Sequence, residues 1–144
     1  TSDFKTFAPT KLLYDGGFNA IDANIVRDGK RWLMFIKDET LKPVRKQIRL
    51  ATSDHATGPY GPASKPITDS WTEGPAAIRI NGQWHLYFDR YNDGRYGLMR
   101  SRDLEHWEDL SDRLHMPKGT RHGSILNVSD EALARLQAVR TLAR

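Results

Sequence analysis

The chain contains no cysteine, which excludes disulfide bonds, thiolate metal sites and cysteine nucleophiles. No apolar run approaches the roughly 20 residues of a membrane-spanning helix. The first residues, Thr1–Lys5, lack the apolar stretch of a signal peptide. Gly16-Gly17 has neither the spacing nor the following helix of a phosphate-binding loop. These absences exclude several classes of protein but leave the cellular compartment unknown.

The chain also lacks a large excess of either charge, because 22 basic residues are interspersed with 18 acidic ones. Basic residues concentrate at 42–49 and 135–144, and neither stretch interleaves aromatic residues as a nucleic-acid groove does. We therefore interpret them as solvated surfaces and expect neither a nucleic-acid nor a membrane partner. The 144 residues, 38% of them apolar, fit one folded domain over 1–144.

A repeat of about 50 residues organises the chain. Trp32 and Trp84 lie 52 positions apart, and each begins an apolar run rich in aromatic residues. Each run follows a polar turn, Asp28-Gly29 or Asn81-Gly82, and such dipeptides are strong signals for a β-hairpin. Self-similarity at this period is typical of repeat folds.

Each repeat is predicted to contain four short antiparallel strands. The predicted ranges are 23–27, 31–37, 47–52 and 60–67, then 76–80, 84–89, 95–100 and 107–110. The odd-numbered and the even-numbered positions of the second strand of each repeat are both apolar. Both faces of these strands are therefore expected to be buried. This pattern predicts an all-β fold of the β-propeller type, with blades at about 20–67 and 73–112.

The flanking segments predict further pieces of the same fold. Residues 4–13 are expected to form the outer strand of a preceding blade, and 121–128 the first strand of a following one. Ser129 is the predicted N-cap of a short C-terminal α-helix at about 130–142. Two blades cannot close a ring, which takes four to eight. We therefore expect part of a longer propeller, or a homo-oligomer of two or three copies that completes one.

Two carboxylates open the repeats at equivalent positions. Asp22 and Glu73 are 51 positions apart, each at the start of a first strand. The first strands of propeller blades line the central channel, so both side chains are expected at one mouth. Glycoside hydrolysis uses such a pair. Turn residues that bind backbone N–H groups are the alternative interpretation. Apolar neighbours around Glu73 are expected to raise its pKa.

Several short segments, in this order, carry a family resemblance. They are 18–23, 35–39, 48–54, 58–60, 72–75, 103–107 and 121–126. Together they resemble glycoside hydrolase family 43, the five-bladed propeller xylosidases and arabinosidases, over residues 4 to about 136. The match is to the C-terminal half of a family member. It implies action on β-xylosides or α-arabinofuranosides of plant-type polysaccharides or oligosaccharides.

The resemblance also implies roles for individual residues. Glu73 matches the general acid, and Asp22 the carboxylate that orients it. Phe18 and Trp71 match aromatic walls of the sugar site, and His122 the histidine near a central calcium ion or water. The family inverts configuration, so a third carboxylate acts as base. Its position falls about one repeat before Asp22, so the chain has no residue that matches it.

Other polar residues leave alternatives open. Arg100 is a candidate contact for a substrate hydroxyl, with a salt bridge equally consistent. The segment 37–39 ends a strand and either faces the site or enters an exposed loop. Histidine spacing predicts no metal site, and no other cofactor is expected.

Two hypotheses for function follow. The leading one is an inverting glycosidase with Glu73 as general acid. The alternative is a non-catalytic carbohydrate-binding or self-assembling half-propeller that lacks the base. A fragment without independent activity is a third possibility that the sequence does not separate from the second.

Overall fold

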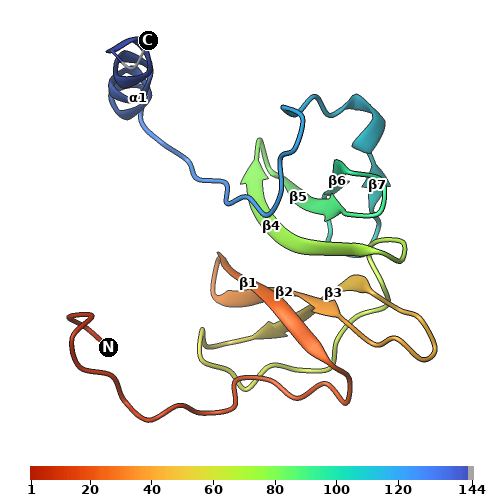
Figure 1. The fold of residues 1–144 in the computed structure, drawn as a ribbon. Coiled ribbons are helices and arrows are strands. Elements are labelled where there is room, and N and C mark those ends of the chain that lie inside the picture. The colour runs from red at the N-terminus through yellow and green to blue at the C-terminus, as the bar shows by residue number, and fades with distance from the viewer. Residues whose placement is uncertain (143–144) are drawn as a thin grey trace.

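A computed structural model describes residues 1–142, which form two antiparallel β-sheets and one C-terminal helix (Figure 1). The strands of the first sheet, in spatial order, are β1 (Ala20–Asp28), β2 (Arg31–Asp38) and β3 (Gln47–Ser53). Those of the second are β4 (Thr72–Ile80), β5 (Gln83–Arg90), β6 (Arg95–Ser101) and β7 (Glu108–Asp109). A 3-10 helix (Ser111–Arg113) and α1 (Asp130–Leu142) follow. The predicted all-β class and the terminal helix are therefore confirmed.

The hairpins form where the turn dipeptides predict them. Asp28 pairs with Arg31 across the first turn, and Ile80 pairs with Gln83 across the second. Asn81 and Gly82 both have positive φ, which the two-residue hairpin turn of type I′ requires. The turn chemistry therefore sets the register of both hairpins.

The core lies between the two sheets. Alternation along β2 sends Leu33 and Phe35 into this core, where they meet Leu86 and Phe88 of β5. The core residues are Leu33, Phe35, Ile48, Leu50, Ile67, Ala77, Trp84, Leu86, Phe88 and Met99.

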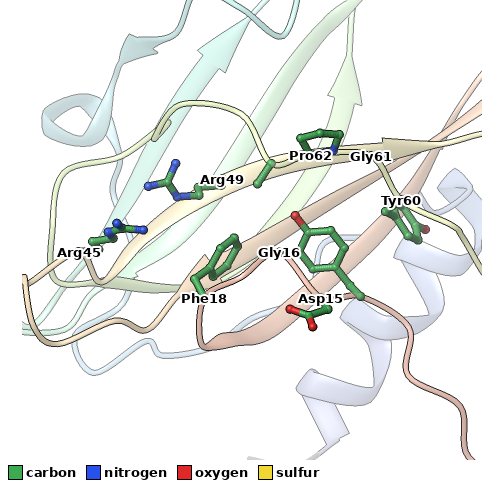
Figure 2. Close-up of a pocket in the computed structure, with 10 residues that line it drawn as sticks. Asp15, Gly16, Phe18, Arg45, Arg49, Tyr60, Gly61 and Pro62 are labelled. Atoms are coloured by element: carbon green, nitrogen blue, oxygen red, sulfur yellow. The ribbon is translucent and has the colours of Figure 1, made fainter.

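A second cluster covers the other face of β2. Met34 and Ile36 are buried there with Ala51, and Phe18 and Tyr60 pack against them (Figure 2). Both faces of β2 are thus buried, as its apolar sequence predicts. We call this side the outer face of the first sheet.

The first repeat contains three strands, so the predicted fourth strand at 60–67 is wrong. The segment still runs beside β3, where the Gly61 and Ile67 N–H groups donate to the Thr52 and Ile48 carbonyls at 2.9 and 2.8 Å. Pro62 and Pro66 have no N–H group, so a regular ladder cannot form through them.

The predicted strands at 4–13 and 121–128 are also wrong within the described residues. Both segments are irregular, and in the second the His122 and Gly123 N–H groups donate to the side chains of Asp89 and Tyr96 instead of to the backbone of a neighbouring strand. Residues 1–13 and α1 extend away from the two sheets (Figure 1). The two sheets of residues 1–142 form no closed ring, so the propeller stays a prediction.

The N-terminal turn repeats a turn of the second sheet, 100 positions later. The Asp3 Oδ1 atom accepts from the Lys5 and Thr6 N–H groups at 2.9 and 3.0 Å. The Asp103 Oδ1 atom likewise accepts from the two residues that stand two and three positions after it, at 2.9 and 2.8 Å. Phe4 and Leu104 both have positive φ. Residues 1–7 therefore have the local conformation of residues 101–107.

The surroundings of the two turns differ. Leu104 and Trp107 pack against the core between the sheets. Their counterparts Phe4 and Phe7 are 84% and 69% exposed. The N-terminal turn therefore has the conformation of the turn at 101–107, but its two phenylalanine side chains do not pack against a sheet.

Among residues 1–142, no helix is both long enough and apolar enough to span a bilayer.

Candidate active site

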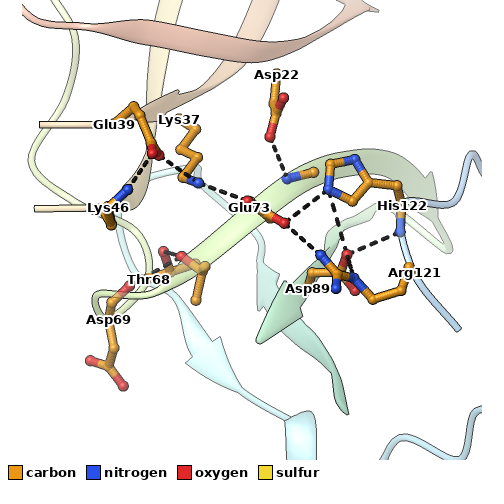
Figure 3. Close-up of polar contacts among 12 residues, drawn as sticks. Asp22, Lys37, Glu39, Lys46, Thr68, Asp69, Glu73, Asp89, Arg121 and His122 are labelled. Atoms are coloured by element: carbon orange, nitrogen blue, oxygen red, sulfur yellow. Dashed lines mark hydrogen bonds and ion pairs between the residues drawn. The ribbon is translucent and has the colours of Figure 1, made fainter. Parts of the chain in front are cut away.

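Three side chains that the sequence predicts for the site, from distant parts of the chain, meet at one end of the two sheets (Figure 3). Asp22 lies on β1, Glu73 on β4, and His122 in the segment that precedes α1. One ligand atom from each lies within 4.8 Å of the other two. The structure thus brings together three of the six residues predicted to form the site.

Irregularities in β1 and β4 set the directions of the Asp22 and Glu73 side chains. The pairing register shifts between Ile21 and Asn24 in β1, and between Glu73 and Ala76 in β4. Such bulges turn side chains out of the regular alternation. The Gly74 N–H group, at the second bulge, donates to Asp22 Oδ2 at 3.2 Å. The two bulges therefore lie at equivalent points of the repeat and contact each other.

Gly74 is required by the contact with His122. Its φ is +58°, in the left-handed region that favours glycine. A Cβ atom at this position would lie 3.1 Å from the imidazole ring. The ring therefore packs directly on the backbone beside Glu73.

Three cationic or nitrogen-bearing side chains surround Glu73. Lys37 Nζ donates to Oε2 at 2.8 Å, and Arg121 Nη2 donates to Oε1 at 2.7 Å. His122 Nε2 lies 3.2 Å from Oε1. Burial raises the pKa of Glu73, but the hydrogen bonds and charges of Lys37 and His122 outweigh it, so the net pKa is lowered. The expected rise in this pKa is therefore wrong for the chain by itself.

Lys37 is the cation at the centre of the network. Its side chain is only 2% exposed, and its Nζ atom lies 2.6 Å from Glu39 Oε2. Tyr91 covers it, with the ring centroid 4.9 Å from Nζ. Burial lowers the pKa of Lys37, but Glu39 and Glu73 outweigh this, so the pKa is raised and the ammonium stays charged. Of the two interpretations of 37–39, the one that faces the site is therefore correct for Lys37 and Glu39.

Asp89 and Arg121 complete the network, and the sequence analysis missed both. Asp89 lies opposite Glu73 in the β4–β5 pairing and is 1% exposed. Its Oδ2 atom accepts from Arg121 Nε at 2.9 Å and from the His122 N–H group at 3.1 Å. The 52-residue offset aligns Asp89 with Lys37, so the repeat contained a signal for it.

The aromatic residues predicted for the site divide between two places. Trp71 is two residues from Glu73, and its ring makes an edge contact with Tyr91 at a centroid distance of 6.2 Å. Phe18 instead lies on the outer face of the first sheet. Trp71 and Tyr91 are therefore the aromatic pair beside the carboxylates.

Arg100 is not part of this cluster. Its Nη2 atom donates to Glu108 Oε2 at 2.6 Å, and it pairs with His85 in the β5–β6 ladder, four positions from Asp89. Of the two interpretations of Arg100, the structure contains the salt bridge.

A calcium ion does not fit this donor set. Calcium prefers six to eight oxygen ligands, whereas the cluster offers two carboxylates and an imidazole. Lys37 and Arg121 already neutralise Glu73, the carboxylate that a cation would need. The three residues therefore do not suit a calcium ion, and the chemistry proposed below uses side chains alone.

Asp22 and Glu73, which stand at equivalent positions of the two repeats, thus lie together at one end of the two packed sheets. The chain belongs to a glycosyl hydrolase family. Residues 1–134 match the family model of a probable glycosyl hydrolase domain, one related to glycoside hydrolase family 43. This match confirms the family resemblance that the sequence motifs indicate. A search of the curated proteins finds no match.

Proposed function

We propose that this chain provides the acid half of an inverting glycosidase site, acting on β-xylosides or α-arabinofuranosides of plant-type polysaccharides. The observation that carries the proposal is the convergence of Asp22, Glu73 and His122 in a chain of this family. Glu73 is the general acid, which protonates the leaving oxygen. Asp22 orients it through the Gly74 backbone, and Trp71 and Tyr91 bind the sugar face.

A general acid donates a proton, and the ionised form of Glu73 does not carry one. In the chain by itself Glu73 is a carboxylate held by Lys37, Arg121 and His122. A general acid must carry a proton, so its pKa has to rise before catalysis. A further carboxylate at the axis has this effect, because like charges disfavour joint ionisation. The base that inversion requires is such a carboxylate, and in inverting enzymes it lies about 6.5–9.5 Å from the acid.

We therefore assign catalysis to a completed propeller, in which another sheet contributes the base and closes the site. A second copy of this chain is the proposed source. The N-terminal turn supports this, because it has the form of a blade edge and its Phe4 and Phe7 side chains are exposed.

The test is hydrolysis of 4-nitrophenyl β-xyloside and α-arabinofuranoside across a protein concentration series. We expect the rate per chain to rise with concentration, and Glu73→Gln to lower it at least about 100-fold. Glu108→Gln is the matched control, since Glu108 is exposed and pairs only with Arg100 among the described residues. An unchanged rate in Glu73→Gln refutes the assignment of the acid.

A non-catalytic carbohydrate-binding module is the second candidate. The lowered pKa of Glu73, caused by Lys37 and His122 in spite of burial, favours it, because this glutamate is a poor proton donor as it stands. This candidate predicts sugar binding without turnover at every protein concentration, whereas the enzyme hypothesis predicts turnover in the assembled form.

A further inference from the structure

We infer that the cavity on the outer face of the first sheet is a subsite for an acidic sugar, a uronic acid unit of the carbohydrate ligand. The inference rests on the proposed carbohydrate function, but the site is separate from Glu73. The cavity has a volume of about 530 Å³, within the usual range of small-molecule sites (Figure 2). It combines aromatic walls with two guanidinium groups.

The first step is the separation of this cavity from the carboxylate cluster. Lys37 and Asp38 are neighbours near the end of β2, so their side chains point to opposite faces of the sheet. Lys37 binds Glu73, whereas Asp38 binds Arg45 and Arg49. The end of β2 therefore contributes Lys37 to the carboxylate cluster on one face of the sheet and Asp38 to the arginines of the cavity on the other face.

The second step is the charge. Arg45 Nη1 and Arg49 Nε both donate to one atom, Asp38 Oδ2, at 3.3 and 3.1 Å. Asp38 is fully buried, and two guanidiniums share its single charge. Arg45 is 42% exposed at the cavity, and Asp38 is its only ion-pair partner among residues 1–142. Arg45 therefore has free N–H groups for a carboxylate, which guanidinium binds in a bidentate manner.

The third step is the aromatic wall. The Phe18 ring lies edge-on to Tyr14 at a centroid distance of 6.1 Å, and the Arg49 guanidinium lies 5.9 Å from the Phe18 centroid. Gly16 permits this packing, since a Cβ atom there would lie 2.6 Å from the Phe18 ring and 2.7 Å from the Tyr14 ring. Asp15, which also lines the cavity, is exposed and offers an acceptor for sugar hydroxyls. An apolar ring face, hydroxyl groups and one carboxylate are together the chemistry of a uronic acid.

Three probes of matched shape or charge test this inference. They are methyl β-D-glucuronide, methyl β-D-glucoside and acetate, titrated into the ¹⁵N-labelled chain while the backbone amides of residues 14–18, 60, 61 and 63 are followed by NMR. We expect the glucuronide to shift these amides and to bind at least about tenfold more tightly than the glucoside. Equal affinity for the two sugars, equal affinity for acetate, or no shift with any probe would each overturn the inference.

Variants separate the guanidinium from the aromatic wall. Arg45→Gln is expected to remove the preference for the glucuronide, and Arg45→Lys to keep part of it. Phe18→Leu is expected to weaken both sugars equally. Arg31→Gln, an exposed arginine paired with Asp28, is the control that keeps wild-type binding. A preference that survives Arg45→Gln overturns the assignment. The readout is binding at residues 14–18 and 60–63, whereas the proposed function is read from released nitrophenol, so either can fail while the other stands.

Discussion

The ionisation of Glu73 is decided by two side chains that the sequence places far away. Lys37 is 36 residues before it and His122 is 49 residues after it, and both hydrogen-bond to its carboxyl group. Local sequence around Glu73, with Trp71 and Pro75, suggests an apolar setting and a raised pKa. The opposite direction arises from tertiary contacts, which no local pattern reports.

Gly74 allows a direct test of the packing beside Glu73. We expect Gly74→Ala to lower the free energy of unfolding by about 2–3 kcal/mol, because alanine is strained at positive φ and its Cβ would press on His122. Gly29→Ala is the matched control. Gly29 has a similar φ of +62° with no atom near its Cβ position, so a loss of about 1 kcal/mol is expected. Equal losses in urea unfolding would contradict the close contact with His122.

At the scale of strands, the ends of β2, β4 and β5 are tied by charged groups instead of apolar packing. The ties between strands are Lys37 to Glu73 and, through Arg121, Glu73 to Asp89. The Lys37–Glu73 pair connects the two sheets at the site, whereas the Arg121 contacts link β4 to β5 within the second sheet. The stability of this end should therefore depend on pH.

We expect the protein to lose stability in acid. Burial raises the pKa of Glu73, yet Lys37 and His122 lower it overall. Hydrogen bonds from Lys37 and Lys46 lower that of Glu39. A lowered carboxyl pKa stabilises the fold above the unfolded value, about 4.5 for Glu, and this contribution is lost as pH falls through the folded value.

The free energy of unfolding in urea should therefore be lower at pH 3 than at pH 7. The double variant Glu39→Gln, Glu73→Gln should show a smaller fall, since the groups that titrate at this end are gone. The same pH dependence in both proteins would show that other carboxylates cause the loss.

Strand prediction succeeded where the signal was local. Asn81-Gly82 specifies its hairpin because both residues accept positive φ. The fourth strand at 60–67 failed because Pro62 and Pro66 interrupt the ladder, a signal that was present in the sequence. The segment 121–128 failed for another reason: its His122 and Gly123 N–H groups are bound by the side chains of Asp89 and Tyr96, tertiary contacts that no local pattern reports.

For the site, the repeat was the informative feature. The offset of 51 positions predicted that Asp22 and Glu73 would meet, and the structure brings them together. The same reasoning applied to β2 and β5 would have found Asp89. Phe18 and Arg100 were placed by family resemblance or by strand position alone. Neither argument determines on which face of a sheet, or at which end of it, a residue lies.

At the scale of the molecule, the segment 1–13 is the feature that supports the proposed homo-oligomer. Its turn is formed as in the second sheet, and its apolar side chains Phe4 and Phe7 face solvent. Exposed apolar side chains of this size favour association.

We expect light scattering to show a mass above the 16.5 kDa of one chain, rising toward a dimer or trimer with concentration. Phe4→Ser with Phe7→Ser should shift the protein toward the monomer without changing its urea unfolding at concentrations where the wild-type chain is also monomeric, because neither side chain is part of the described core. Leu136→Ser, an exposed position on α1, is the control. A monomer at every concentration would refute the homo-oligomeric propeller.

The adjacent Lys37 and Asp38 have a consequence for folding fidelity. A slip of β2 by one residue would exchange the two faces of the strand. The carboxylate of Asp38 would then meet Glu73 and Glu39, and the ammonium of Lys37 would meet Arg45 and Arg49. The apolar residues of β2 tolerate such an exchange, since both of its faces are buried. Like charges on both sides forbid it, so this pair of opposite charges excludes a misfolded sheet that hydrophobicity alone would permit.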